Sequence, residues 1–421
     1  MYETFDLFPG AKLRCVWDRR FKQSCLSIQF LRPMCRQEAA MNALIPAVLL
    51  RGSQQHPDLK CITERLDELY GASIGTLVRR IGDYQTTGFY CNFIEDRFAL
   101  ESDRLLEETI AFAGELLLQP LPAEEGFCPE FVESEKRNLI ATIESEKADK
   151  RAYAAGQLLK IMGKEDSFGI PRLGDVEDVA AITPESAYRH YKRILEESPM
   201  EFFYVGSAPG QQVANLLNLV FGSLVRNCVS LPPQSAFHAA QKQDIVETME
   251  VTQGKLCMGF LSPITNRSSQ FAAMQVLCAV FGSGQTSKLF MQIREQQSLC
   301  YDISAAYYGS KGILTVFAGI DFDKETAVRQ GILQQLQACQ EGSITPAELN
   351  AAKQMLLSGL RTVTDAPGSI EGFTSTSIIG GLDRTLDRYA AEIRAVTAGD
   401  VAQAAQSLAL HSTFFLKGGA Q

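Results

Sequence analysis

Histidine is scarce in this sequence of 421 residues, which contains only four: His56, His190, His238 and His411. A zinc site carried by one helix needs two ligands on one face, typically His at i and i+4 with a Glu between them as general base. No two of the four histidines lie within five positions of each other. The loop around His56 is polar, and Tyr188-Arg-His-Tyr-Lys192 is typical of a solvated helix face. Local spacing therefore gives no reason to expect a histidine metal ligand.

Closely spaced cysteine pairs, long apolar runs and a secretory signal are missing as well. The eleven cysteines form no Cys-x-x-Cys pair, and several lie in apolar runs such as residues 276–281. This scatter favours buried free thiols in a reducing compartment over a disulfide framework or a zinc ribbon. No stretch approaches the roughly 18 to 20 apolar residues of a membrane span. The start lacks the basic and apolar regions of a signal peptide. We therefore expect a soluble, cytoplasmic protein without a membrane span.

A strong charge of either sign is also lacking. Forty Lys and Arg residues against 49 Asp and Glu residues give a formal charge of -9, spread along the whole chain. Such a balance provides no broad attraction to phosphate backbones or anionic lipid, so we expect no nucleic-acid partner. Apolar residues make up 46% and charged residues 21%, which is typical of a globular protein. The length suggests two to three domains.

Strand and helix patterns follow the same order in both halves of the chain. Residues 27–31 and 85–93 alternate as half-buried strands do, with helix candidates between and after them. In the second half, a strand-like segment at 256–261 precedes a helix candidate at 269–281. Further strand-like and helical segments follow, and the chain ends on a strand-like segment at 412–417. The repeated order predicts a duplication into two similar α+β domains.

The domain boundaries are expected near a proline-containing stretch in the middle of the chain. Residues 229–237 include Leu231-Pro-Pro-Gln-Ser235, which favours an extended linker over a helix. We therefore predict an N-terminal domain over residues 1–228, a linker over 229–240 and a C-terminal domain over 241–421.

Two common catalytic motifs are not present. The turn Phe281-Gly-Ser-Gly-Gln-Thr-Ser-Lys288 superficially suggests a phosphate loop, but that motif requires a glycine directly before the lysine, and here Ser287 stands there. No Gly-x-Ser-x-Gly elbow or other local nucleophile signature is visible, although partners of a hydrolytic triad can meet in space. A structural Gly-rich turn is the better interpretation of residues 281–288.

Arg294 and Tyr301 follow this turn, near the end of a predicted helix and the start of a predicted strand. Arg presents a planar fork of donors that suits a carbonyl or carboxylate, and a Tyr hydroxyl donates one oriented hydrogen bond. Together the two side chains could bind the main chain of a peptide. An Arg seven residues before a Tyr is common, however, and the pair alone favours a structural role.

The segment 282–303 resembles the second-domain signature of the insulinase-like (pitrilysin-type) zinc peptidases, the family that includes the mitochondrial processing peptidase. The matching residues are Ser287-Lys-Leu-Phe290, Ile293-Arg-Glu295 and Leu299-Cys-Tyr-Asp302. The first half is similar to the family at Leu49-Leu-Arg-Gly-Ser53, Leu66-Asp-Glu-Leu-Tyr-Gly-Ala-Ser73 and Gly169-Ile-Pro-Arg-Leu-Gly174. The resemblance runs from about residue 15 to 415, and the order of the motifs makes it specific.

The sequence departs from the family where active members hold zinc. Alignment through Arg51-Gly-Ser53 places Ala43 and Ala47 where the two histidines of His-x-x-Glu-His belong, and Pro46 where the catalytic Glu belongs. The family's third ligand, a Glu, corresponds to Thr142, although a shift of two residues would bring Glu144 near. Alanine and proline supply neither a ligand nor a base. We therefore expect no metal or other cofactor in this chain, and no catalytic residue.

The resemblance implies two homologous α+β domains, each an antiparallel sheet with helices packed on one face, facing each other across a cleft. It also implies a non-catalytic subunit of a heterodimeric zinc metallopeptidase, similar to short bacterial paralogues associated with peptide maturation and elongation factor P modification. Arg294 and Tyr301 would then bind substrate in an active site whose zinc is held by a partner subunit. The expected partners are that homologous zinc-binding subunit and a peptide substrate, with a homodimer as the alternative state of the isolated chain.

Two other functions fit the same resemblance. The chain could serve as a scaffold, like the inactive family members that form core subunits of respiratory complexes. It could also be a peptide-binding protein with no catalytic partner.

Overall fold

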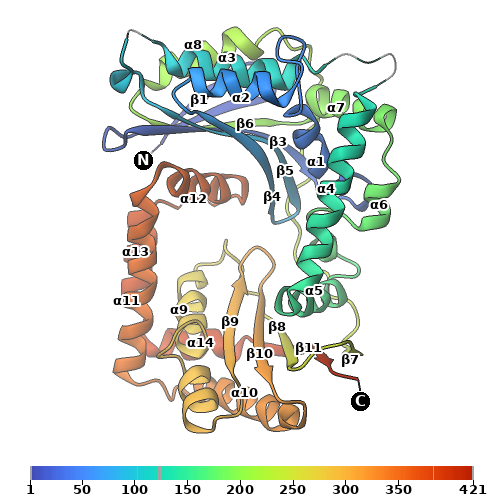
Figure 1. Cartoon of the computed structure of the whole chain (residues 1–421). Helices are drawn as coiled ribbons and strands as arrows, with labels where there is room; N and C mark the ends of the chain where they lie inside the picture. The colour runs from blue at the N-terminus through green and yellow to red at the C-terminus, as the bar shows by residue number, and fades with distance from the viewer. Residues whose placement is uncertain (1, 102, 122, 124–125, 383, 420–421) are drawn as a thin grey trace. The chain divides into compact units, whose positions relative to one another are not determined.

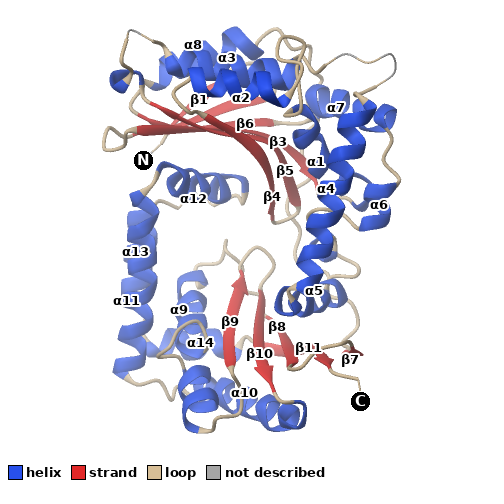
Figure 2. Cartoon of the chain, in the orientation of Figure 1, coloured by secondary structure: helices blue, strands red, loops and turns tan. Residues whose placement is uncertain are grey.

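The protein is a mixed α+β structure with two sheets, one in each of two compact units (Figures 1 and 2). This computed structural model describes residues 2–101, 103–121, 123, 126–382 and 384–419. The two-sheet α+β architecture confirms the predicted fold class, but each sheet contains one parallel strand pair and is not wholly antiparallel as predicted. Among the described residues, no helix combines the length and apolar character needed to cross a bilayer.

The sheet of the first unit has six strands. Its order is β1 (Glu3–Asp6), β2 (Ala11–Trp17), β6 (Met200–Gly206), β3 (Gln23–Pro33), β5 (Tyr84–Ile94) and β4 (Ser73–Ile81). The β2–β6 pair is parallel and the other neighbours are antiparallel. Strand β4 therefore forms one edge of this sheet.

One face of the first sheet packs against a helical layer. Along β3, the alternate residues Leu26, Ile28 and Phe30 are buried in this core, as the two-residue period of a strand requires. The helices of this unit are α1 (Arg36–Leu49), α2 (Leu59–Glu68), α3 (Leu105–Leu118), α4 (Pro129–Ala148), α6 (Val176–Ala180), α7 (Pro184–Glu197) and α8 (Gly210–Phe221). Helix α4 runs on into the second unit after Glu144.

The other face of this sheet carries the intervening β3 residues Cys25, Ser27 and Gln29. Helix α12 (Pro367–Ile379), which comes from the second half of the chain, packs there. Its Ile370 contacts Cys25 in a small apolar cluster, and its Glu371 accepts hydrogen bonds from Ser27 and Gln29. The second face of the sheet is therefore covered in part by a helix, which the expected single helical face did not include.

The sheet of the second unit has five strands. Its order is β7 (Asp244–Thr248), β11 (Ala409–Lys417), β8 (Gly254–Leu261), β10 (Ile313–Ile320) and β9 (Asp302–Tyr308), with only the β7–β11 pair parallel. On one face lie α9 (Phe271–Phe281), α10 (Glu325–Gln340), α11 (Pro346–Thr362), α13 (Leu386–Ala395) and α14 (Ala398–Gln406). Strand β9 is an edge strand.

Helix α5 (Lys150–Met162), from the first half of the chain, packs on the opposite face of this second sheet. Its Ala154, Leu158 and Met162 are buried against strand residues that include Cys257 and Phe414. The neighbouring strand residues Leu256 and Phe415 point instead into the helical core. Short helical turns occur at Asp96–Phe98, Ser167–Gly169, Phe322–Lys324 and Val363–Asp365, and a π-helical segment spans Phe290–Gln296.

Each compact unit consequently draws on both halves of the chain. The first comprises residues 1–144, 170–235 and 364–376, and the second comprises 145–169, 236–363 and 377–421. The predicted domains 1–228 and 241–421 are contiguous, whereas the compact units exchange the segments that contain α5 and most of α12. This difference arises because each of these two helices buries its side chains against the sheet of the unit formed mainly by the other half.

Candidate functional site

Ala43, Pro46 and Ala47, the positions where the resemblance would place a zinc motif, lie on α1. Ala43 and Pro46 are buried and Ala47 is partly buried. Pro46 lines a cavity of only about 20 Å³ together with apolar side chains such as Phe30 and Phe89. None of the three side chains carries a donor atom for a metal. The residues at these positions do not fit zinc, and no metal-dependent step follows from them.

The proline also changes the hydrogen bonding of α1. A proline within a helix has no N–H to donate to the carbonyl four residues earlier, here that of Asn42. The hydroxyl of Thr87 on β5 donates to this carbonyl instead, at 2.5 Å. Thus a strand side chain satisfies the carbonyl that Pro46 leaves open, and α1 continues to Leu49.

A buried polar network surrounds the same turn of α1. The Asn42 amide donates to Gln85 Oε1 at 2.8 Å, and Asn42 Oδ1 lies 2.7 Å from His190 Nε2. Gln85 in turn donates to the carbonyls of Ala39 and Arg172, at 3.0 and 2.7 Å. Because the Asn42 oxygen is an acceptor, His190 must donate from Nε2. The network orders α1 against β5 and α7 without metal chemistry.

His190 is buried, so the expectation that it lies on a solvated helix face is wrong. The buried residues of α7 are Ala187, His190, Tyr191 and Ile194, which recur at helical spacing and define one face. Burial is the main cause that lowers the pKa of His190, to about 4. The imidazole is therefore neutral near pH 7.

The candidates for a third ligand are also unsuited to hold a metal with α1. The Thr142 hydroxyl donates to the carbonyl of Asn138, one turn earlier in α4, at 2.9 Å. Thr142 and Glu144 are both exposed. In the described ranges, no three His, Cys, Asp or Glu residues are grouped so that they could bind a metal ion.

Arg294 lies in the π-helical segment Phe290–Gln296 of the second unit. Its guanidinium stands over the Phe290 ring, 4.6 Å from the centroid, and lies 3.4 Å from Glu295. The side chain remains 40% exposed. The chain then turns through Ser298, which has φ of 53°, and enters β9. Arg294 therefore keeps donors available to a ligand.

Tyr301 directly precedes β9 and is 58% exposed. Its N–H donates to the Gly319 carbonyl at 2.8 Å, which fixes the backbone at the sheet end. Its hydroxyl donates to Asp321 Oδ1 at 2.7 Å, and the same carboxylate pairs with Lys324 at 2.9 Å. The hydrogen bond to Asp321 raises the pKa of Tyr301, so the phenol stays protonated and able to donate.

Arg294 and Tyr301 lie close to the same buried residue. The charge of Arg294 acts on the thiol of Cys300, whose pKa burial raises to about 11. No hydrogen bond links the Arg294 and Tyr301 side chains in the part of the chain that the structure describes. In the structure both predicted residues lie in the segment that leads into edge strand β9, and both are at least partly exposed. Their role in binding a substrate stays a prediction.

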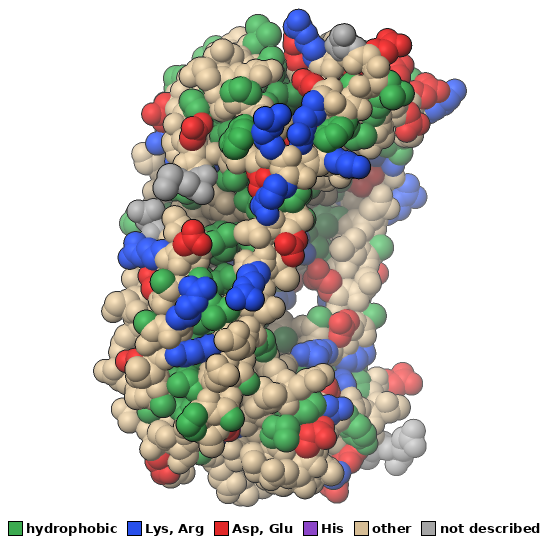
Figure 3. Space-filling view, turned by 90° about the vertical axis from the view of Figure 1, so that its left-hand side faces the viewer, with side chains coloured by type: hydrophobic (Ala, Val, Ile, Leu, Met, Phe, Trp, Pro, Cys, Tyr) green, Lys and Arg blue, Asp and Glu red, His purple; other side chains and the backbone are tan. Residues whose placement is uncertain are grey.

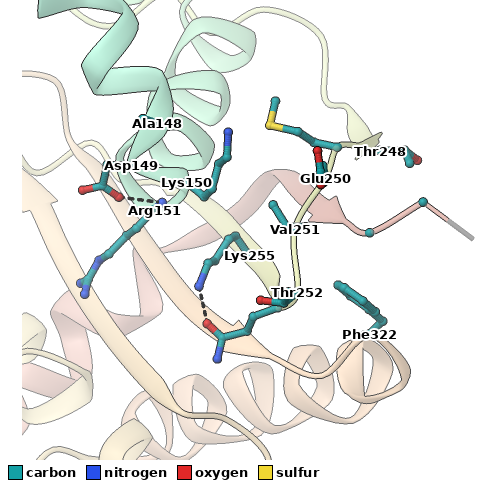
Figure 4. A pocket seen from close by; sticks show the side chains of 14 residues that line it. Ala148, Asp149, Lys150, Arg151, Thr248, Glu250, Val251, Thr252, Lys255 and Phe322 are labelled. Carbon is teal, nitrogen blue, oxygen red and sulfur yellow. Dashed lines mark hydrogen bonds between the residues drawn. The ribbon is translucent and has the colours of Figure 1, made fainter. Parts of the chain in front are cut away.

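A groove of about 1450 Å³ in the second unit was not predicted from the sequence (Figure 4). It is lined by the start of α5, the loop between β7 and β8, and Phe322, and we call it the basic groove. Its charged residues are Asp149, Lys150, Arg151, Glu250 and Lys255. Asp149, Lys150 and Arg151 are consecutive in sequence, whereas Glu250 and Lys255 join them only through the fold, so no sequence motif marked the groove.

Comparison with known proteins agrees with the resemblance of the sequence. The family model described as "Peptidase M16 inactive domain" matches residues 181–356. The Bacillus subtilis protein "Probable inactive metalloprotease YmfF" is 27% identical over 409 residues, covering 97% of this chain and 96% of that protein. Its name and the family description concur with the altered zinc motif on α1.

Solved structures give the same fold. The crystal structure of a conserved protein from Enterococcus faecalis V583 matches with a TM-score of 0.93 and 25% identity, covering 100% of this chain and 99% of that chain. A peptidase M16 inactive domain from Pseudomonas fluorescens matches with a TM-score of 0.81 and 16% identity, covering 100% and 98% of the two chains. The chain is therefore similar to the peptidase M16 (insulinase-like) family over residues 181–356, and along nearly its whole length to a relative named as a probable inactive metalloprotease.

Proposed function

We propose that this protein is the non-catalytic subunit of a two-subunit zinc peptidase, and that Arg294 and Tyr301 bind the peptide substrate beside a zinc ion held by the partner. The observation that carries this proposal is a contrast within one chain. The metal positions on α1 hold Ala43, Pro46 and Ala47, whereas Arg294 and Tyr301 are present and exposed. A chain that has donors for a substrate but no metal site of its own depends on another subunit for the zinc.

The chemistry of Tyr301 suits this role. A protonated hydroxyl aimed at a peptide carbonyl stabilises the negative charge that develops on that oxygen during attack. In the free chain the hydroxyl donates to Asp321, so a substrate carbonyl must replace Asp321 as its acceptor. Tyr301 is exposed and the Arg294 side chain is 40% exposed, so a substrate carbonyl can reach the Tyr301 hydroxyl. Arg294 supplies further donors for a main-chain carbonyl.

The position of the pair at an edge strand also supports peptide binding. Strand β9 begins at Asp302, directly after Tyr301, and pairs with β10 on one side only. On the outer side of β9, Ala305 already bonds to Gly282 and Ser283, and an extended peptide can hydrogen-bond to an edge strand only outside such a contact. A peptide on this edge would pass next to Arg294 and Tyr301.

The expected partner is a homologous subunit with an intact His-x-x-Glu-His motif. Family members often pair with homologous subunits, and a stable pair should bury about 1,200–2,000 Å² or more in total. On the face drawn in Figure 3, hydrophobic side chains are interrupted by charged and polar ones, so no single large apolar area marks the partner's position there. The proposal therefore rests on the residues that each subunit would contribute to the site: zinc ligands from the partner, and Arg294 and Tyr301 from this chain.

Reconstitution tests this function. The chain should be mixed with a homologous His-x-x-Glu-His protein from the same organism, above micromolar concentration, and assayed on a library of quenched fluorescent peptides. We expect peptidase activity that neither chain shows alone and that a chelator abolishes. Complex formation without any gain in activity would favour the scaffold function, and peptide binding without a complex would favour a peptide-binding protein that acts alone.

A further inference from the structure

The basic groove and Tyr301 lie at the same end of the sheet of the second unit. In the sheet, Lys255 on β8 pairs with Gly319 on β10, and Gly319 pairs with Asp302 on β9. Gly319 also accepts the N–H of Tyr301. Phe322, which lines the groove, follows Asp321, the acceptor of the Tyr301 hydroxyl. Strand β10 and the turn at Asp321–Phe322 thus connect the groove to Tyr301, the proposed substrate-binding residue.

Residue 319, which lies between Lys255 and Asp302 in the sheet, is a glycine, and neighbouring side chains occupy the space where its side chain would lie. A Cβ atom at this position would collide with the Asp302 carboxylate and press on the amide of Gln253. Among the three paired residues Lys255, Gly319 and Asp302, the middle one therefore has no side chain. The Asp302 carboxylate and the Gln253 amide therefore share this face of the sheet with Lys255.

The lining of the groove has a surplus of positive charge. It holds three cationic side chains and two carboxylates. One carboxylate, Asp149, is occupied as the N-cap of α5, where it accepts from the N–H groups of Arg151 and Ala152 at 2.9 and 3.1 Å. Arg151 in turn reaches Asp302 at 3.3 Å and Ser304 at 2.8 Å and stands over the Phe317 ring. Its guanidinium is thereby held in place at the side of the groove.

The two lysines of the groove have only neutral partners among the described residues. Lys255 is partly buried and donates to the side-chain oxygen of Gln253. Lys150 donates to the carbonyl of Lys147 at 3.3 Å. A partly buried ammonium gains more from a carboxylate than from an amide, because a charge-assisted hydrogen bond is shorter and stronger. In Figure 4 the two lysines come from α5 and from β8, on different walls of the groove.

We infer that the basic groove binds a carboxylate of the peptide substrate, with Lys255 as its main partner and Lys150 and Arg151 as supporting cations. The inference rests on the proposed peptide-binding function and adds a preference to it. The carboxylate is either an Asp or Glu side chain or the C-terminal carboxylate of the peptide. Lys255 is then a specificity-determining residue.

Three fluorescent peptides of one apolar sequence distinguish the sources of the carboxylate. The first has no acidic residue and an amidated C-terminus, the second adds one internal Glu, and the third has a free C-terminus instead of the amide. Their dissociation constants are measured by anisotropy on the full-length chain at low ionic strength, because salt screens exposed charges. We expect the second or the third peptide to bind roughly tenfold more tightly than the first, as one charge-assisted bond allows.

Lys255→Gln should remove this preference, whereas Lys255→Arg should retain it. Lys242→Gln, at an exposed lysine of the same unit, is the matched control and should have no effect. Circular dichroism of each variant establishes that it is folded. Equal binding of all three peptides, or a preference that survives in Lys255→Gln, would overturn the inference while the proposed function stands. If no peptide binds to the folded chain, both are contradicted.

Discussion

Glu371 and Arg79 form an ion pair in which the Glu371 side chain is completely buried and the Arg79 side chain is 31% exposed. The Glu371 carboxylate accepts two hydrogen bonds from Arg79, at 3.0 and 2.9 Å. It also accepts from Ser27 Oγ at 2.7 Å and from Gln29 Nε2 at 2.9 Å. Four donors from β3 and β4 side chains therefore converge on one residue of α12 and fix this helix on the first sheet.

Removal of this carboxylate should destabilise the first unit strongly. Glu371→Ala leaves a partly buried guanidinium and two buried polar side chains without their acceptor, which typically costs about 3–5 kcal/mol. Glu371→Gln keeps one acceptor oxygen and should cost less. The free energy of unfolding in urea measures both. The control is Glu64→Ala, which breaks an exposed ion pair with Lys60 and should cost no more than about 1 kcal/mol. Equal losses in Glu371→Ala and Glu64→Ala would contradict this role.

His190 should make the stability of the fold depend on pH. Its pKa is about 4 in the folded chain and about 6.5 when unfolded, so the unfolded state binds more protons between these values. Stability is therefore full above pH 6.5 and falls as the pH decreases toward 4. Between pH 7 and pH 5 the expected loss from this group is about 2 kcal/mol.

Comparison of variants isolates this contribution. His190→Gln can still donate to Asn42 but does not titrate, so its unfolding free energy should change less between pH 7 and pH 5 than that of the unaltered chain. His238→Gln, at an exposed histidine, should behave like the unaltered chain. An identical pH dependence in all three proteins would show that His190 is not buried in its neutral form.

The isolated chain should bind no stoichiometric zinc and cleave no peptide. Ala43, Pro46 and Ala47 carry no ligand atoms, and Thr142 is bonded within its own helix. Elemental analysis of the purified chain, after dialysis against zinc-containing buffer, measures this directly. One tightly held zinc per chain, or cleavage that a chelator stops, would contradict the assignment of α1 as a site without metal.

The sequence predicted those elements whose local pattern and packing agree. The helix candidate at 269–281 corresponds to α9, which spans Phe271–Phe281. The alternating segments at 27–31 and 85–93 lie within β3 and β5. In each case a short stretch of chain contains the whole signal.

Other features depend on contacts between distant segments and could not be predicted locally. Helices α5 and α12 each pack on the second face of a sheet. Under α12 that face carries the polar Ser27 and Gln29, so the alternation of β3 is typical of a strand with one solvated face. His190 was misplaced because its polar neighbours in sequence concealed the buried face that it shares with Tyr191. The basic groove likewise combines Lys255 with residues about one hundred positions earlier.

Substitution of Arg294 should separate substrate binding from stability. In the reconstituted pair, Arg294→Ala should raise KM, because a donor for the peptide is lost. The aliphatic stem of Arg294 packs near Phe290, so a small decrease in melting temperature is expected as well. Arg294→Lys keeps the charge but not the planar fork, and should restore KM only in part. A lower melting temperature with unchanged KM would assign Arg294 a structural role alone.

The most direct measurement for the shared active site is the turnover number of a Tyr301→Phe variant in the reconstituted pair, expressed per folded complex. The substitution keeps the ring and removes only the hydroxyl, which in the free chain contacts Asp321 at the surface. If Tyr301 donates to the carbonyl under attack, kcat should fall by about 10²–10³ with assembly and melting temperature nearly unchanged. An unchanged kcat in a fully assembled Tyr301→Phe complex would contradict the account.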